Sequence, residues 1–354
     1  MARLPLSGKI VEADDSMPAD TAYRLASEGT ALLWQGDFQN ARQLLNAVAR
    51  RTDRKSPKKG SSLAEVFHLH RQFQSQRARI LNKLLITLEA DYRILLPRAP
   101  DIKKACTEAY GLREGQQQQT TVPLRELLGI IGAHEWRKKG VFVPALNERI
   151  HPHYGVFAPV RSEYVNLVAE MPLPSLTLAF DVGTGTGVLA AVLAKRGVAR
   201  IIASDQDPRA LTCAIENLDR LGFKNQVAVV QADLFPEGRA PLIVCNPPWI
   251  PARPSSPLEH AIYDLDSQML LRFLNGLASH LEPNGEGWLL LSDLAEHLGL
   301  RSRDQLLKAI ENAGLKILGK TDIPSAHPRT RDESDPLYTA RAAETTSLWR
   351  LGAK

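Results

Sequence analysis

Features that define several common protein classes are missing from this 354-residue sequence. Its three cysteines, Cys106, Cys213 and Cys245, lie far apart and form no Cys-x-x-Cys pair, so we expect neither a disulfide framework nor a zinc site. No stretch reaches the roughly 18 apolar residues of a membrane span. The N-terminal residues also lack the apolar core of a secretion signal. The sequence therefore predicts a reduced, cytoplasmic protein without a membrane segment.

Familiar catalytic motifs are also missing. His134-Glu135 would need a second histidine at position 138 to form a zinc-protease motif, but that position is Lys138. The sequence contains no Gly-x-Ser-x-Gly elbow and no phosphate-binding P-loop. We therefore expect no metal site, and we interpret Cys245 as a buried strand residue rather than a nucleophile. The net charge of +5 is compatible with an acidic partner but does not identify one.

The N-terminal part, residues 1–140, has mainly the pattern of helices. Residues 18–50 resemble a helical hairpin, and an apolar stripe predicts one long helix over residues 63–88. Residues 50–60 are basic and polar, which is typical of a solvated loop, although their cations could also contact phosphate. We therefore predict a mostly α-helical N-terminal domain, with a possible role in substrate recognition.

From residue 141 onward the pattern changes. Residues 141–165 contain β-forming residues broken by prolines and predict a hairpin-like connector. Residues 166–354 then alternate strand and helix patterns, which is typical of a doubly wound parallel α/β sheet. The helix after the second strand is well marked, since Asp207 can cap it and Pro208 suits its first turn. Seven strands are expected, the last two joined without a helix, at residues 176–182, 201–205, 227–231, 242–246, 287–292, 316–323 and 346–351.

A glycine-rich turn follows the first of these seven strands. It reads Asp181-Val-Gly-Thr-Gly-Thr-Gly187, whereas nicotinamide enzymes use G-x-G-x-x-G to hold a pyrophosphate. Because glycine has no Cβ, the backbone of such a turn lets a ligand approach closely. The spacing suits the amino-acid end of S-adenosylmethionine, which carries no phosphate. We expect this cofactor to be bound by Asp181, Gly183, Thr184, Gly185, Thr186 and Gly187.

Two carboxylates complete the expected cofactor site. Asp205 closes the second strand, where a carboxylate can accept hydrogen bonds from both ribose hydroxyls. Asp233 follows the third strand and is expected to meet the adenine amino group, with a surface loop residue as the alternative. Asp207 is a rival ribose ligand, but its position at a helix start already explains it.

The residues that follow the fourth strand indicate the reaction. Asn246-Pro247-Pro248-Trp249 lies where doubly wound sheets bind their ligands. An amide or exocyclic base amine is a poor nucleophile because its lone pair is delocalised. The Asn246 side-chain oxygen and the Pro247 carbonyl can each accept one N–H bond, and Trp249 can stack on the planar group. These residues predict methyl transfer to a planar NH2 group, and we also count Asn246 among the cofactor contacts.

These motifs resemble those of class I S-adenosylmethionine-dependent N-methyltransferases, most closely the HemK-type release-factor glutamine methyltransferases. The resemblance covers about residues 150–323 and includes Tyr154-Gly-Val-Phe-x-Pro-x-Arg161-x-Glu163 before the first strand. It implies a seven-stranded Rossmann-like methyltransferase sheet behind a small helical domain, with Phe157 and Arg161 at the pocket entrance. The sequence departs from the glutamine enzymes at Trp249, where they usually have Tyr, and in an unusually long stretch at residues 324–344.

The substrate molecule stays open at this point. Enzymes that modify bases of ribosomal RNA, transfer RNA and DNA share the Asn-Pro-Pro-aromatic motif with the glutamine enzymes. The expected partner is therefore a macromolecule, either RNA or DNA, or a translation protein such as a release factor. The alternative is a non-catalytic RNA- or protein-binding adaptor built on a degenerate methyltransferase fold. The retention of Asp181, the three glycines and Asn246 together argues against that alternative.

Overall fold

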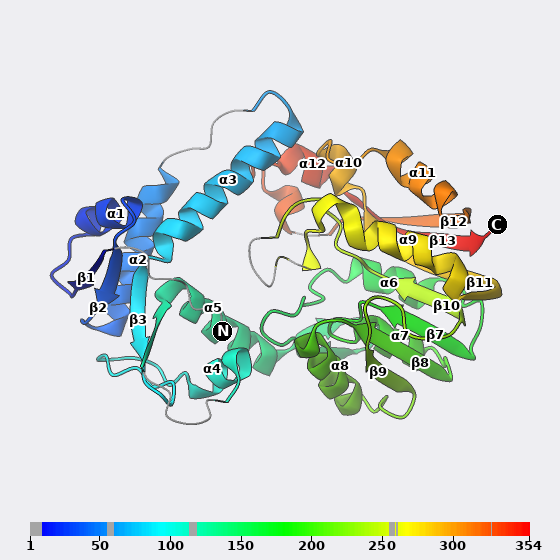
Figure 1. Cartoon of the computed structure of the whole chain (residues 1–354), viewed down its shortest axis with the longest axis horizontal. Helices are drawn as coiled ribbons and strands as arrows, with labels where there is room; N and C mark the ends of the chain where they lie inside the picture. The colour runs from blue at the N-terminus through cyan, green and yellow to red at the C-terminus, as the bar shows by residue number, and fades with distance from the viewer. Residues whose placement is uncertain (1–8, 55–59, 113–118, 255–258, 260, 327) are drawn as a thin grey trace. The chain divides into compact units, whose positions relative to one another are not determined.

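The computed structural model describes residues 9–54, 60–112, 119–254, 259, 261–326 and 328–354, which divide into two compact units (Figure 1). The first unit comprises the residues up to Gly60 together with His68–Glu135. The second comprises Ser61–Phe67 and Trp136–Lys354. None of the described helices has the length and apolar character of a membrane span.

The first unit is built on a four-stranded sheet in the order β1-β2-β3-β4. The first three strands run parallel, whereas β4 is antiparallel to β3. Strand β3 is apolar and largely buried, and α1 and α2 each bury one face. The elements are β1 (Ile10–Ala13), α1 (Ala19–Ser27), β2 (Ala31–Trp34), α2 (Phe38–Asp53), α3 (Leu63–Leu81), β3 (Leu84–Leu88), α4 (Lys103–Tyr110), β4 (Thr120–Pro123) and α5 (Leu124–Lys139).

The N-terminal unit contains a four-stranded sheet beside its helices, and the sequence did not predict this sheet. Residues 18–50 hold strand β2 between two helices, and the helix expected over residues 63–88 ends at Leu81, before β3. Strand β3 reads Leu-Leu-Ile-Thr-Leu, and so short an apolar run has no periodicity that separates a buried strand from a buried helix. The loop expected from residue 50 is also wrong at its start, since α2 continues to Asp53; residues 55–59 lie outside the described residues.

The second unit contains the seven-stranded sheet that the sequence predicts. Its strand order is β12-β13-β11-β10-β7-β8-β9, and β13 runs antiparallel to both of its neighbours. Each predicted strand is confirmed, with shifts confined to the ends. The strands are β7 (Leu178–Val182), β8 (Arg200–Asp205), β9 (Val227–Gln231), β10 (Ala240–Cys245), β11 (Leu281–Ser292), β12 (Leu315–Pro324) and β13 (Thr345–Ala353).

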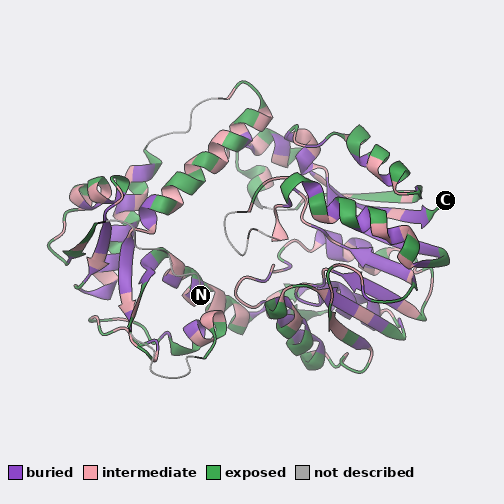
Figure 2. Ribbon diagram, in the orientation of Figure 1, coloured by how far each residue is buried: buried purple, intermediate pink, exposed green. Residues whose placement is uncertain are grey.

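Helices cover both faces of this sheet (Figure 1). Along β10, Leu242 and Val244 join an apolar cluster with α6, α7 and α8, whereas Ile243 and Cys245 join a second cluster with α9 and α11. Successive side chains of a strand point to opposite faces, so β10 is apolar throughout and is buried on both sides (Figure 2). The covering helices are α6 (Glu163–Glu170), α7 (Val188–Lys195), α8 (Pro208–Arg220), α9 (Gln268–His280) and α11 (Arg303–Asn312).

The segment ahead of the sheet begins with a short hairpin of β5 (Val141–Val143) and β6 (Glu148–Ile150). Lys195, at the end of α7, donates hydrogen bonds to the carbonyls of Ala145 and Leu146 in its turn. From this hairpin the chain continues without regular structure to α6 and so passes through the Tyr154–Glu163 motif.

The connection between β12 and β13 differs from the expectation that no helix joins these strands. It contains a 3-10 turn, η3 (Pro328–Arg331), and the short helix α12 (Tyr338–Ala342). Leu337 and Ala340 are buried in a third apolar cluster with Leu294 and Leu298, in and just after α10 (Leu294–His297). The polar and proline-rich composition of residues 324–344 hides these two apolar anchors, so periodicity alone could not find the helix.

A close approach of α9 to β11 makes Gly287 a test of this packing. A Cβ at Gly287 would clash with the side-chain carbons of Leu277, which is fully buried in α9. We expect Gly287→Ala to lower the free energy of unfolding by about 1–3 kcal/mol, because overpacking displaces buried groups. Urea denaturation of the full chain measures this loss.

Gly319→Ala, in strand β12, is the matched control. The nearest atom to a Cβ there is the Nη1 of Arg350, at 3.8 Å, so the change in unfolding free energy should stay within about 0.5 kcal/mol. Equal losses for the two variants would show that the contact with Leu277 is not what requires glycine at position 287.

Candidate functional site

The carboxyl ends of three neighbouring strands gather the expected site residues at one edge of the sheet. Strand β7 lies between β10 and β8, and all three run parallel. In this register Val182 stands opposite both Cys245 and Ser204. The glycine loop after Val182, Asp205 at the end of β8 and Asn246 after β10 therefore begin at the same level of adjacent strands.

The three glycines of the loop all have positive φ, at +73°, +56° and +80° for Gly183, Gly185 and Gly187. At Gly187, which precedes α7, a Cβ would lie 3.3 Å from the Cα of Ala214 in α8, so glycine is required for these helices to pack. At Gly185 a Cβ would meet nothing within 4 Å. The backbone around Gly185 therefore faces open space, as a close-bound ligand requires.

Asp181 braces this loop from inside the protein. Its Oδ2 accepts hydrogen bonds from the Thr184 hydroxyl at 2.6 Å and from the Ala190 amide at 3.1 Å. Burial raises the pKa of the Asp181 carboxyl to about 6, against these two hydrogen bonds and with a smaller contribution from Asp205. Thr184 and Thr186 are buried as well, so these side chains of the loop point inward while the backbone at Gly185 stays open.

Asp205 is joined directly to the glycine loop. Its Oδ2 accepts a hydrogen bond from the Gly185 amide and its Oδ1 from the Asp207 amide, both at 3.0 Å. Burial raises the pKa of the Asp205 carboxyl. A carboxylate offers about four lone-pair positions, so acceptor capacity remains for ribose hydroxyls. Asp207 caps α8 through the Arg209 amide, as the sequence predicts.

Asp233 lies at the surface after β9 (Val227–Gln231). Its side chain is 69% exposed and pairs with Arg272 of α9 at 2.8 Å. The hydrogen bond from Arg272 lowers the pKa of the Asp233 carboxyl. Its contact with adenine stays a prediction, which would require the carboxylate to leave Arg272 or to share it.

The Asn246 turn forms the other side of the site. The Asn246 Oδ1 accepts a hydrogen bond from the indole Nε1 of Trp249 at 2.9 Å. Trp249 is half-buried, packs against three apolar clusters and meets the ring of Tyr164 edge-on, with ring centres 6.4 Å apart. Pro247 is buried beneath the turn. Burial raises the pKa of the preceding Cys245 thiol, which opposes a role as nucleophile.

Arg161 connects the motif before the sheet with this turn. Its guanidinium lies 5.5 Å from the ring centre of Trp249 and donates to Glu344 at 2.6 Å. Phe157, from the same segment, is half-buried. Tyr164 was not among the predicted site residues, although an aromatic residue directly after the Arg161–Glu163 motif was a usable signal. Glu344 was not predicted either, because no local pattern in the sequence indicates it.

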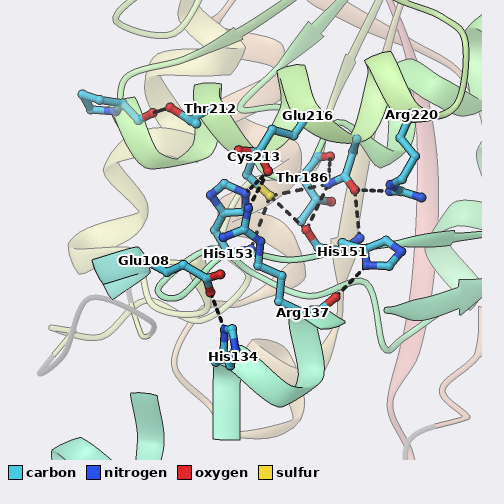
Figure 3. A network of polar contacts seen from close by, with 12 residues as sticks. Glu108, His134, Arg137, His151, His153, Thr186, Thr212, Cys213, Glu216 and Arg220 are labelled. Carbon is cyan, nitrogen blue, oxygen red and sulfur yellow. Dashed lines mark hydrogen bonds and ion pairs between the residues drawn. The ribbon is translucent and has the colours of Figure 1, made fainter. Parts of the chain in front are cut away.

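Figure 3 shows how the segment ahead of this motif is tied to α8 and to the glycine loop. The buried side chain of Asn217 accepts a hydrogen bond from the His151 amide at 2.8 Å and donates one to the Thr186 carbonyl at 3.1 Å. One amide thus holds the loop, the helix and the connector together. Asn217 thus lies on the inner face of α8, whereas its apolar neighbour Ile215 is 52% exposed.

The start of α9 also packs at this edge. Asp264 accepts hydrogen bonds from the amides of Met269 and Leu270 at 2.9 and 3.2 Å. Asp266 and Ser267, inside this turn, have φ of +54° and +55°, a strained backbone of the kind that collects at functional sites. The Cε of Met269 lies within 2.9 Å of where a Cβ of Gly183 would be, so α9 and the glycine loop are in contact.

The donor set of the site suits an organic cofactor. Among the described residues, no three His, Cys, Asp or Glu side chains gather to hold a metal ion. The open glycine backbone, the acceptors of Asp205 and the Asn-Pro-Pro turn on the neighbouring strand fit S-adenosylmethionine. Together with the order of the seven strands, they define a Rossmann-like class I methyltransferase.

The comparisons with known proteins identify the family. The model of the methyltransferase small domain matches residues 148–313. A tRNA1(Val) (adenine(37)-N6)-methyltransferase of Bacteroides fragilis is 32% identical over 165 residues, which are 42% of this chain and 69% of that protein. The chain therefore belongs to the methyltransferase small domain family of S-adenosylmethionine-dependent methyltransferases.

Two other relatives match shorter parts of their own length. A release factor glutamine methyltransferase of Moorella thermoacetica is 33% identical over 164 residues, covering 38% of this chain and 56% of that protein. A ribosomal protein L11 methyltransferase of Pelotomaculum thermopropionicum is 48% identical over 69 residues, covering 19% of this chain and 22% of that protein. The chain therefore spans just over half of the first of these two relatives and about a fifth of the second.

The raised pKa of Asp181 predicts how stability depends on pH. Between its ordinary value of 3.8 and about 6, the folded chain keeps a proton that the unfolded chain releases. The resulting stabilisation is complete below pH 3.8 and is lost as the pH rises through 6. Relative to Asp181→Asn, the unfolding free energy of the wild type should fall by up to roughly 3 kcal/mol between pH 4 and pH 7.

Urea denaturation at several pH values measures that difference, and a carbon NMR titration of the Asp181 carboxyl gives the pKa directly. A titration midpoint near 4, or a wild-type advantage that grows with pH, would contradict the burial of the Asp181 carboxyl beneath the loop.

Proposed function

We propose that this chain transfers the methyl group of S-adenosylmethionine to the nitrogen of a planar NH2 group on a macromolecule. One observation carries the proposal. The Asn246-Pro247-Pro248-Trp249 turn ends β10, directly beside the strand β7 from which the glycine loop begins. A nitrogen held at Asn246 would therefore lie next to the cofactor, and proximity of this kind contributes strongly to catalysis.

S-adenosylmethionine, when bound, supplies a methyl group on a positively charged sulfur. The glycine loop would hold its amino-acid end and Asp205 its ribose. The Asn246 Oδ1 and the Pro247 carbonyl accept the two N–H bonds of the substrate. This draws the nitrogen lone pair out of conjugation and directs it toward the methyl group. Transfer would join the methyl carbon to this nitrogen in place of its bond to sulfur, and the methylated nitrogen would release its proton to water.

The Asn246 Oδ1 and the Pro247 carbonyl are held in place before the substrate binds, and acceptors preorganised in this way lower the barrier to reaction. Pro247 is buried and lacks an N–H that could compete for the acceptors. Asn246 is held by Trp249, and Trp249 is held by three apolar clusters. The exposed part of the Trp249 ring can stack on a planar substrate group, which contributes roughly 1–3 kcal/mol when that group is a base.

The substrate class follows from the type of nitrogen. An adenine amine in a transfer RNA and a glutamine amide in a release factor, the targets named for two relatives, are both planar NH2 groups. Base amines of RNA or DNA and protein glutamine amides are therefore the substrates to test. We favour nucleic acid or the translation machinery, because the chain carries a net charge of +5 and η3 contributes Arg329 and Arg331.

Asn246→Ala separates the substrate role of Asn246 from cofactor binding. We expect it to abolish methyl transfer while the affinity for S-adenosylmethionine stays within about tenfold, because the lost acceptor serves the substrate. Calorimetric titration with S-adenosylmethionine and S-adenosylhomocysteine gives the affinities. Radiolabelled methyl transfer to ribosomal RNA, transfer RNA, DNA and release factors gives the activity.

Asn312→Ala, at the exposed end of α11, should change neither quantity. Loss of cofactor affinity in Asn246→Ala equal to its loss of activity would assign Asn246 to the cofactor or to the fold. A wild-type chain that binds neither cofactor form would reject the enzyme and favour the non-catalytic adaptor.

A further inference from the structure

A line of four side chains leads from a buried carboxylate to the proposed substrate acceptor. The Glu344 side chain is 0% exposed and accepts two hydrogen bonds from Arg161, at 2.6 and 3.3 Å. The Arg161 guanidinium lies 5.5 Å from the ring centre of Trp249. The Trp249 indole donates to the Asn246 Oδ1 at 2.9 Å. Residues far apart in the sequence are thus linked, one to the next, to the side-chain amide of Asn246.

The indole selects the orientation of the Asn246 side chain. An indole Nε1–H is a donor and never an acceptor, so it pairs with the oxygen of the Asn246 amide and not with the nitrogen. A carbonyl oxygen has two lone pairs. With one taken by Trp249, the other remains for a substrate N–H, while the amide is prevented from turning its NH2 end into the same place.

The Trp249 ring is held from two directions. Tyr164, which is buried in α6, meets it edge-on with an interplanar angle of 86°. Arg161 lies over the ring, where a guanidinium is attracted to the aromatic face. Any shift of Arg161 would therefore loosen the ring and, through the indole N–H, the Asn246 amide.

Arg161 is long and flexible, and its position is set by Glu344. The two hydrogen bonds between them use the planar fork of the guanidinium, which fixes orientation as well as distance. Glu344 is fixed in turn, because its Oε1 also accepts a hydrogen bond from the Ser292 hydroxyl at 2.7 Å, at the end of β11. The carboxylate is thus anchored to the sheet edge that carries the site.

We propose that Glu344 is a positioning residue that orients Asn246 through Arg161 and Trp249. The proposal rests on the proposed function of Asn246 as the substrate acceptor. It assigns a task to the end of the long 324–344 segment: to place one carboxylate behind the Asn-Pro-Pro-Trp turn. It also gives Trp249 a task that phenylalanine at this position could not perform, since phenylalanine has no N–H.

The first test observes the indole directly. With nitrogen-15 in the tryptophan side chains, the Trp249 indole signal is assigned by its loss in Trp249→Phe. Glu344→Gln keeps the size of the side chain but removes the charge that orients Arg161. We expect the Trp249 indole signal to shift and its N–H to exchange faster with water. An unchanged Trp249 signal in Glu344→Gln would overturn the proposal.

Glu286→Gln is the matched control. Glu286 is also buried, accepts from an arginine, Arg350, at 2.8 Å, and accepts from the indole of Trp288 at 2.9 Å. It lies within β11, six residues before Ser292. This variant should move the Trp288 signal and leave both the Trp249 signal and methyl transfer unchanged, whereas Glu344→Gln should move the Trp249 signal.

Arg161→Lys provides a second route to the same contact. Lysine keeps the charge opposite Glu344 but lacks the planar fork and stacks less well on an aromatic face. The Trp249 indole signal should shift in this variant too. A Trp249 signal that stays in place in a folded Arg161→Lys chain would contradict the role of the guanidinium.

The second test measures coupling. Glu344→Gln should lower kcat about tenfold while cofactor affinity stays within about twofold, because the change misplaces the acceptor and leaves the cofactor loop intact. In a Trp249→Phe background the same substitution should lower kcat less than about twofold, since the connecting ring is gone. Equal factors in both backgrounds would overturn the proposal.

The two tests separate this proposal from the function on which it rests. The indole signal needs no substrate, so a shift in Glu344→Gln supports the positioning contact whatever the chain methylates. Failure of the wild type to transfer a methyl group would contradict the proposed function alone. If the wild type transfers a methyl group normally but the Trp249 indole signal does not shift in Glu344→Gln, only the positioning role is contradicted.

Discussion

The parallel pairing of β7 with both β10 and β8 is the constraint on which the site depends. Because parallel strands bring their carboxyl ends to one edge, three segments that are distant in sequence begin side by side: the glycine loop, the stretch after Asp205 and the Asn246 turn. The apolar residues on both faces of β10 hold this register, since a slip of one residue would exchange its two buried faces. The chemistry at the edge is thus fixed by packing in the interior.

The site combines rigid supports with open backbone. Asp181, Asn217 and Glu344 are buried polar groups that hold, respectively, the glycine loop, the connector and Arg161. Each is hydrogen-bonded inside the protein, which is the condition for burying a polar side chain without a large loss of stability. All three are buried, whereas the backbone around Gly185 faces open space. The residues that support the site are therefore different from those that are open to a ligand.

The catalytic half of the fold was predictable because its signals are local. Alternating apolar strands, the cap at Asp207 with Pro208, and the two motifs all lie within short windows of sequence. The sheet of the first unit was missed, since Leu84–Leu88 gives the same apolar signal as the end of a helix. Glu344 and Asn217 were missed for a different reason. Their partners, Arg161 and His151, are brought to them only by the tertiary fold, and a single sequence contains no record of that proximity.

The third apolar cluster, which contains Leu294, Leu298, Leu337 and Ala340, limits the order in which the second unit can fold during synthesis. It joins Phe67 to Leu337 and Ala340, which lie far later in the sequence. Because a ribosome makes a chain from its N-terminal side, the apolar surface around Phe67 and Ile250 lacks these partners until Leu337 and Ala340 have been translated. The second unit therefore cannot be closed progressively from its N-terminal side during synthesis.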